Sequence, residues 1–410
     1  MSEKTTSEPT NLARVLSLPM LVFYGLGVTI GAGIFALIGE VVRLAGDQAP
    51  LSFLAAGITA GLTGVSYALL VRIFPRAGGE AVFVHNGLGP LPARLAGYGI
   101  VVTAIISSAA ISLAFGGYVA SLTAWPVTPL AIAVIIFLAA IAGYGVMLSV
   151  SFAAAITILE LGLLVVVAFL GTPALLSPET QIAPSFAPNP GALSGILGGA
   201  LLAFFAFIGF EDIENMAEET RDPVYVLPRA IFWTLGITIT IYVAIALVAV
   251  HAVDRTSLLN SSAPMATVFE SVTGLDGRPV AAIAAFAMIN GILVQMLMAA
   301  RVLYGMAREG LAPAWLGAVS ENRKTPARAT WIVALSVTAF AALFPLAGLA
   351  ATTSFVTLSI FTLVNVSLFT IGRRHDDKLT RRLAPLGLVA AAVCIALMGW
   401  NLIVNITIVH

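Results

Sequence analysis

Carboxylates in unusual positions are the side chains of this sequence best suited to chemistry. Glu211, Asp212 and Glu214 directly follow an aromatic run, and Glu160 stands alone in a long apolar stretch. A charge at the centre of a helix in lipid costs at least about 2.5 kcal/mol, so such groups are expected to face a cavity, a partner or water. A carboxyl in that position can take up and release a proton. Glu160 and Glu211 are therefore our candidates for carrying a coupling proton, with a purely structural role as the alternative.

Other kinds of chemistry have little support in the sequence. Cys394 is the single cysteine, which excludes an internal disulfide framework and a metal site built from cysteines. The four histidines, at 85, 251, 375 and 410, match no metal-ligand spacing, and no P-loop pattern is present. We therefore expect no metal, no cofactor, no direct use of ATP and no enzyme. The net charge of zero gives no reason to expect nucleic-acid binding.

Glycines interrupt the first apolar stretch near its middle. Gly31 and Gly33 flank Ala32, and glycine weakens a helix by about 1 kcal/mol relative to alanine. An unwound turn at this point is one interpretation. A glycine face for close packing between membrane helices is the other, and the motif alone leaves both open.

The elements that must position these residues are membrane helices. The chain is 59% hydrophobic and only 10% charged, with a mean hydropathy of +1.02. Its apolar runs are continuous over about 20 residues, as a spanning helix requires, and do not alternate as barrel strands do. They predict an all-α integral membrane protein with about eleven spans, near 20–44, 50–71, 95–121, 127–147, 152–172, 193–217, 229–252, 279–307, 329–349, 351–372 and 383–408.

The basic residues predict the orientation. With residues 1–19 as a cytoplasmic segment, 17 of the 20 Lys and Arg residues fall in cytoplasmic segments. Only Arg43, Arg255 and Arg278 fall outside, in agreement with the positive-inside rule. We expect a multi-pass protein of the cell (inner) membrane, with its amino terminus in the cytoplasm.

The first and sixth spans are both predicted to be interrupted, and they lie five spans apart. This is the pattern of an inverted five-plus-five repeat with a substrate site between its halves. It predicts a transporter core at 20–373, with repeats at 20–172 and 193–373, followed by an additional helix at 374–410.

Four motifs carry a family resemblance. They are Ile30-Gly-Ala-Gly-Ile-Phe35, Phe205-Ala-Phe-Ile-Gly-Phe-Glu211, Ala217-Glu-Glu-Thr-Arg-Asp-Pro223 with Leu227-Pro-Arg-Ala230, and Arg301-Val-Leu-Tyr-Gly-Met-Ala-Arg-Glu-Gly310. In this order they resemble the amino acid, polyamine and organocation (APC) transporter superfamily, over spans one to ten. The resemblance implies a sodium/leucine-transporter-type core in which spans one and six bind an amino acid. Many members have a twelfth span, which we do not expect in this chain.

The resemblance also implies roles for individual residues. Amides of the first interruption would hold the substrate carboxylate, carbonyls near both interruptions would hold its ammonium, and aromatic rings would form a wall and part of a gate. The amides are those of Gly31, Ala32 and Gly33; the carbonyls are near Ile30, Phe205, Ala206 and Ile208; the wall is Phe205 and Phe207, and the gate Phe210.

Polar residues of the third and eighth spans complete the predicted pocket. Ser107, Ser108 and Asn290 are candidates for contact with the substrate side chain, although such residues also bond to their own helix or join two helices. Some similar sodium-independent transporters carry a lysine in the fifth span, where Glu160 stands here. The lysine mechanism is therefore not transferred, and coupling to protons, to sodium or to nothing stays open.

The preferred interpretation is a secondary active transporter working by alternating access, with proton-coupled uptake of a neutral amino acid. The alternatives are an exchanger, a carrier of cationic amino acids or amines, and a channel or sensor on the same fold. A cationic substrate is favoured if Glu160 or Asp212 faces the pocket.

Overall fold

The computed structural model describes residues 14–75, 78–144, 150–178, 180–187, 192–308, 310, 312–318 and 326–409. Over these ranges the secondary structure is helical, and the one β-bridge is an isolated parallel pair, Leu16 with Thr220. The prediction of an all-α chain is confirmed. Most of the predicted amino-terminal segment, residues 1–13, lies outside the described residues.

Twelve long helices form the body of the described chain. They are α1 (Leu18–Thr29), α2 (Ala32–Ala45), α3 (Ala49–Ile73), α5 (Pro90–Thr123), α6 (Val127–Tyr144), α7 (Val150–Leu170), α9 (Leu193–Phe204), α10 (Pro223–Ala252), α13 (Arg278–Arg308), α14 (Ala327–Leu343), α15 (Leu346–Gly372) and α17 (Pro385–Val409). Several begin with proline in the first turn, where the missing N–H has no helical partner in any case.

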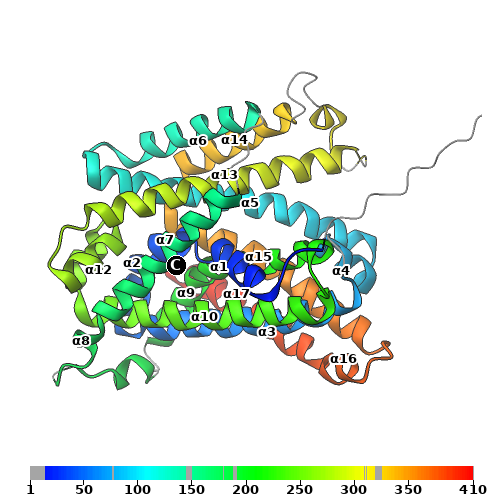
Figure 1. Ribbon diagram of the computed structural model, residues 1–410, viewed down its shortest axis with the longest axis horizontal. Helices are drawn as coiled ribbons and strands as arrows, with labels where there is room; N and C mark the ends of the chain where they lie inside the picture. The colour runs from blue at the N-terminus through cyan, green and yellow to red at the C-terminus, as the bar shows by residue number, and fades with distance from the viewer. Residues whose placement is uncertain are drawn as a thin grey trace, which may run out of the picture.

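Short helices connect the long ones. The α-helical ones are α4 (Gly79–Leu88), α8 (Thr172–Leu175), α11 (Arg255–Asn260), α12 (Pro264–Thr273) and α16 (Lys378–Leu383); the 3-10 ones are η1 (Gly46–Gln48), η2 (Ala183–Phe186), η4 (Phe205–Phe207), η5 (Phe210–Glu219) and η6 (Ala314–Gly317). Most of the long helices run along the length of the molecule, with α4 and α16 at one end and α8 and α12 at the other (Figure 1). We call these the α4 end and the α12 end.

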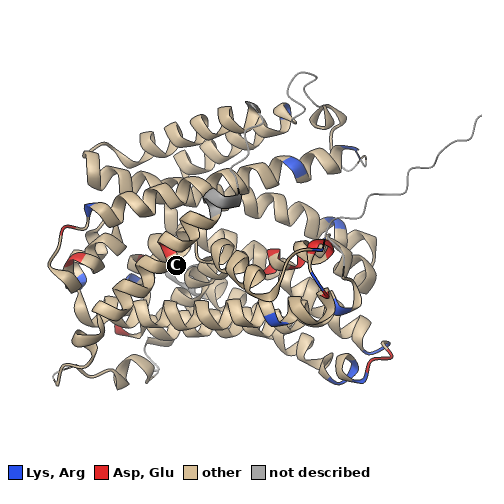
Figure 2. Cartoon of the chain, in the orientation of Figure 1, with Lys and Arg blue, Asp and Glu red and all other residues tan. Residues whose placement is uncertain are grey.

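Eight helical stretches of the described chain are long and apolar enough to cross a membrane. They are Ala32–Ile73, which combines α2 with α3, Pro90–Thr123, Ala154–Leu175, Leu193–Glu219, Pro223–Ala252, Arg278–Arg308, Leu346–Gly372 and Lys378–Ile403. Three shorter apolar helices, Leu18–Thr29, Val127–Gly143 and Ala327–Leu343, accompany them. Lys and Arg gather mainly at the two ends, with few charges in the broad band between (Figure 2). The chain is a multi-pass membrane protein, while the count of eleven spans and the inverted repeat stay predictions.

The first and sixth predicted spans are both interrupted at the expected glycines. Helix α1 ends at Thr29, Ile30 and Gly31 leave the helical conformation, and α2 begins at Ala32. In the sixth span Ile208 is extended and Gly209 has a φ of 121°, a left-handed conformation that favours glycine. The second half of this span, η5, is a 3-10 helix, which the apolar pattern did not predict.

The last helix packs tightly on the core of the bundle. Helix α17 lies against α15, α3 and α9. Buried Asn365 of α15 donates to Thr63 of α3 at 3.1 Å and contacts Cys394 of α17, while Asn401 of α17 donates to the carbonyl of Leu197 in α9 at 3.3 Å. The additional helix thus contacts the second predicted repeat through Asn365 and Leu197, and the first through Thr63, whose hydroxyl lies 3.9 Å from the Cys394 sulfur.

Candidate functional site

The backbones of the two helix interruptions contact each other at two points. A Cβ added at Gly33, just after the first interruption, would lie 2.5 Å from the Cα of Ala206, just before the second. A Cβ added at Gly209, within the second interruption, would lie 2.8 Å from the carbonyl oxygen of Val28, just before the first. Because a side chain fits at neither position, glycine is required for the two backbones to meet.

One hydroxyl joins both interruptions. The Tyr242 hydroxyl of α10 reaches the Thr29 carbonyl at 3.2 Å and the Ala206 carbonyl at 3.0 Å. Carbonyls at the end of a helix lack intrahelical partners, so this buried group satisfies an acceptor from each half of the site. Sequence analysis missed Tyr242, although a fully buried tyrosine in an apolar span usually has a polar partner.

Glu211 contacts the second interruption through its carboxylate. Its carboxylate accepts the backbone N–H of Gly209 at 2.8 Å, and the residue is buried. The carboxylate thereby caps the start of η5, where unpaired amides favour a negative charge. Glu211 therefore lies directly beside the second interruption.

Glu160 of α7 is the second predicted coupling residue, and it is also buried. Helix α7 packs on α1, because a side chain at Gly27 would collide with Thr157. The Glu160 carboxyl is within electrostatic range of the Tyr242 hydroxyl. No hydrogen bond joins Glu160 to Tyr242 among the described residues, so any influence of Glu160 on the interruptions acts through this electrostatic interaction.

The predicted aromatic wall is core packing in this conformation. Phe207 meets the Tyr242 ring edge to face at 5.2 Å between centroids, and Phe210 packs on Tyr67 and Phe361 at 5.7 and 5.5 Å. Phe207 and Phe210 are fully buried and line neither of the two cavities described below. Phe205 is also buried and lines neither cavity.

A cavity of about 960 Å³ reaches from the α4 end to the second interruption. We call it the α4-end cavity. Of the predicted site residues it brings together Ile208 and Glu211. It adds Asp212, the residue on which the cationic alternative depends, and Glu80, which sequence reasoning did not place in the pocket. Its remaining polar lining includes His85, Asn86, Arg94, Thr103, Asn215, Gln295 and Thr357. The cavity is large enough for a small organic ligand.

Glu80 is held at this cavity by a hydrogen bond. The Tyr67 hydroxyl donates to its carboxylate at 3.0 Å. Loss of solvent raises the pKa of the Glu80 carboxyl above its ordinary value, while the bond from Tyr67 opposes that rise. The signal available in the sequence was the pair of glycines before it: Gly78 and Gly79 both have positive φ and bring the start of α4 close to η5.

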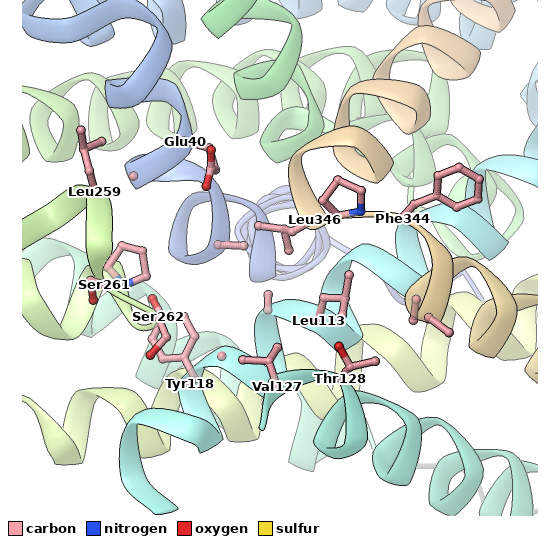
Figure 3. A pocket seen from close by; sticks show the side chains of 18 of the residues that line it. Glu40, Leu113, Tyr118, Val127, Thr128, Leu259, Ser261, Ser262, Phe344 and Leu346 are labelled. Atoms are coloured by element: carbon pink, nitrogen blue, oxygen red, sulfur yellow. The ribbon is translucent and has the colours of Figure 1, made fainter. Parts of the chain in front are cut away.

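A smaller cavity of about 460 Å³ lies at the opposite end (Figure 3). We call it the α12-end cavity. It is lined by Glu40, Tyr118, Thr128, Ser261 and Ser262 among others. Here the Tyr118 hydroxyl of α5 donates to the Phe35 carbonyl of α2 at 2.8 Å and accepts the Met265 amide of α12 at 3.1 Å. Tyr118 thus joins three elements at this end.

The predicted pocket residues of spans three and eight are not brought to either cavity. Ser107 and Ser108 both donate to the Ala104 carbonyl of their own helix, at 3.2 and 2.7 Å. The Asn290 side-chain oxygen has no hydrogen-bond partner among the described residues. In this conformation the serines follow the alternative stated for them, bonding within one helix.

Comparison with known proteins assigns the family. The model of the family described as amino acid permease matches residues 16–409. An uncharacterized transporter of Mycobacterium tuberculosis is 34% identical over 392 residues, covering 94% of this chain and 86% of the relative. The branched-chain amino acid permease BcaP of Bacillus subtilis is 27% identical over 396 residues, covering 91% and 84%. The vacuolar cationic amino acid transporter 4 of Arabidopsis thaliana is 30% identical over 390 residues, covering 88% and 64%. With its two facing helix interruptions and this match over nearly its whole length, the chain belongs to the amino acid permease family of the APC superfamily.

Proposed function

We propose that this protein is a secondary active amino acid transporter that works by alternating access. The observation that carries the proposal is the crosswise contact of two interrupted helices at a cavity that opens to one end of the molecule. Interrupted helices offer unpaired amides and carbonyls at mid-membrane, which is what an amino acid zwitterion requires. The permease family to which the chain belongs supports the same class of substrate.

The backbone at the interruptions would bind the α-amino acid group. The amides of Gly31, Ala32 and Gly33 stand at the start of α2, where a helix lacks internal partners and attracts an anion. Carbonyls at the ends of α1 and η4 would accept from the ammonium, those of Ile30, Phe205, Ala206 and Ile208 as implied by the family motif. The Ala206 carbonyl oxygen already accepts a hydrogen bond from Tyr242, so the substrate ammonium would donate to its second lone pair.

We assign the α4 end to the cytoplasm, because the basic residues favour that side. The open α4-end cavity then makes this an inward-facing conformation. At the other end, Tyr118 ties α5 to α2 and α12, as a closed outer side would require. During transport the α4 end would close and the opposite end would open.

Proton coupling is our preferred mechanism, with Glu211 and Glu160 as carriers. Glu211 is bonded to the second interruption, so protonation would release the Gly209 amide and alter the site. Glu160 would act indirectly, through its electrostatic interaction with the Tyr242 hydroxyl that donates to the Ala206 carbonyl. Each protonation change is thereby linked to the geometry of the substrate site.

Two substrate classes remain, with a neutral amino acid as our first proposal. Small residues around the interruptions and the aromatic residues behind them support it. The specific observation in favour of a cationic amino acid is that Asp212 lines the α4-end cavity beside Glu211 and Glu80. Relatives named for branched-chain and for cationic amino acids are both present, so family membership does not decide.

Uptake into proteoliposomes under separate driving forces tests the mechanism. A labelled amino acid is offered under an imposed proton gradient, a sodium gradient, or with unlabelled amino acid inside. We expect concentrative uptake under the proton gradient, with pH dependence weakened in Glu211→Gln and in Glu160→Gln. Unchanged pH dependence in both variants would reject these two carriers. Uptake confined to preloaded vesicles would mean an obligate exchanger, and equilibration without accumulation would mean a channel.

A further inference from the structure

Basic residues gather on the connection between the last two long helices, at the α4 end of the molecule (Figure 2). This connection, residues 373–384, joins α15 to α17 and contains α16. Five of its first ten residues are Lys or Arg, and all five are exposed: Arg373, Arg374, Lys378, Arg381 and Arg382. We call these five residues the basic patch. No carboxylate in the described ranges lies within ion-pair distance of any of them.

The connection that carries the basic patch is held in a defined conformation. The Asp377 carboxylate caps α16 by accepting the Thr380 amide at 3.1 Å and the Thr380 hydroxyl at 2.6 Å. A Cβ added at Gly372, the last residue of α15, would lie 2.7 Å from the Cβ of Ala384, so the two ends of the connection pack together. The acidic residues of the connection are Asp376 and Asp377, and five basic residues outnumber them. The exposed charge is therefore predominantly positive.

Exposed apolar residues lie beside the basic patch. Leu379 of α16 is exposed between the basic residues, and Leu388 and Val389 are exposed in the first turns of α17. The stretch Lys378–Ile403 is long and apolar enough to cross a membrane. Exposed apolar side chains of a spanning helix face lipid acyl chains, whereas cations at its end lie at the depth of the phospholipid headgroups. The patch and the start of α17 thus match the two parts of a phospholipid.

The chemistry of the basic patch suits a phosphodiester. Four of its five residues are arginines, and a guanidinium presents five N–H donors in a planar fork that pairs with phosphate oxygens. The Arg373 guanidinium lies 5.1 Å from the centroid of the Phe369 ring, a cation–π contact that keeps it at the end of α15. A soluble acidic partner would have no use for apolar residues beside the charges, whereas a phospholipid requires them.

We propose that the basic patch and the exposed start of α17 bind an anionic phospholipid, with its phosphate on the arginines and an acyl chain along α17. The lipid belongs to the leaflet at the α4 end, the end that we assign to the cytoplasm, where basic segments next to a span attract anionic lipids. The site is separate from the amino acid pathway, because no residue of the patch lines the α4-end cavity. It adds a lipid partner whichever amino acid is carried.

Native mass spectrometry of the purified full-length protein tests the lipid site. The protein in a non-ionic detergent is titrated with phosphatidylglycerol or with phosphatidylcholine carrying the same acyl chains, and the bound lipid molecules are counted. The test variant, Arg381→Gln with Arg382→Gln, removes two charges of the patch. The matched control, Arg308→Gln with Arg328→Gln, removes two exposed arginines that are also predicted to be cytoplasmic but lie outside the patch. A melting curve without added lipid shows that each variant is folded.

We expect the wild type to bind phosphatidylglycerol at least about tenfold more tightly than phosphatidylcholine, because each basic residue near an anionic headgroup contributes several-fold in affinity. The test variant should lose at least about tenfold in affinity for phosphatidylglycerol, while the control keeps it.

Equal affinity of the wild type for the two lipids, or an equal loss in the test variant and the control, overturns the proposal. Displacement of the lipid by an equal concentration of inorganic phosphate also overturns it, because the patch would then be a site for free anions. If the test variant does not fold, Arg373→Gln with Arg374→Gln replaces it under the same expectations. None of these outcomes bears on amino acid transport.

Discussion

Single residues at the interruptions set both the geometry and the chemistry of this site. Two glycines allow two backbones to touch, one tyrosine hydroxyl satisfies a carbonyl from each interruption, and one carboxylate caps the second. The glycines could be found in the sequence because glycine weakens a helix in an apolar span. Glu211 could be found because a carboxylate is costly in such a span. Tyr242 and Glu80 were missed, since their importance depends on partners 36 and 13 residues away that only folding brings near.

Gly33→Ala tests the contact between the interruptions. The added Cβ would lie 2.5 Å from the Ala206 Cα, so a backbone must move, and overpacking of this kind costs about 1–3 kcal/mol. We expect a lower melting temperature in detergent and reduced uptake. Gly61→Ala is the control, because a Cβ at that position in α3 meets open space. Equal stability of the two variants would contradict the close contact.

Tyr242→Phe tests the shared hydroxyl. The change keeps the ring, with its packing on Phe207, and leaves the carbonyls of Thr29 and Ala206 without their donor. Unsatisfied buried acceptors cost about 1–3 kcal/mol, so the variant should melt at a lower temperature. Uptake at low substrate concentration should fall as well, because both halves of the site lose their common support. Wild-type stability and uptake together would show that the bond has no role.

At the scale of elements, helix type and end points were predictable to different degrees. Continuous apolar runs predicted the long helices, since each needs only length and hydrophobicity. The 3-10 form of η5 was not predicted, because it depends on how Phe210 and Glu214 pack against α3 and α4 and not on the local pattern. The structure does not bring the serines of α5 to either cavity, and the sequence could not show this because the neighbours of a helix decide which way it faces.

Tyr118→Phe tests the link between elements at the α12 end. Removal of the hydroxyl breaks the bond to the Phe35 carbonyl of α2 and leaves the Met265 amide of α12 without its acceptor. We expect a destabilised closed outer side, visible as faster thiol labelling of a cysteine placed at Ala114, a buried residue that lines the α12-end cavity. Labelling that is unchanged from the Ala114→Cys parent would argue that Tyr118 is not part of that closure.

At the scale of the whole molecule, the two cavities lie toward opposite ends, and the two helix interruptions lie between those ends. This arrangement suits a protein that exposes one site to each side in turn. Neither cavity could be predicted from the sequence, because a cavity is the space left by many helices together. The presence of a membrane bundle with two interruptions could be predicted, because hydropathy and glycine position are local.

Alternating access predicts opposite changes at the two ends. Asn215→Cys introduces an exposed thiol in the α4-end cavity, and Ala114→Cys a buried thiol at the α12-end cavity. The native Cys394 is fully buried and contributes little background labelling. Closing the α4 end with a disulfide should slow labelling at 215 and speed it at 114. Changes of the same sign at both positions would contradict a two-state exchange.

The central claim is that this chain carries amino acids across a membrane by exposing one site alternately, and counterflow tests it most directly. Proteoliposomes are preloaded with a high concentration of an unlabelled amino acid, diluted, and supplied with a trace of the same labelled compound. We predict that label accumulates transiently inside the vesicles above its outside concentration. A carrier that has released unlabelled amino acid outside binds a labelled molecule and returns with it to the inside. Label that only equilibrates, or fails to enter for every amino acid offered, would contradict the account.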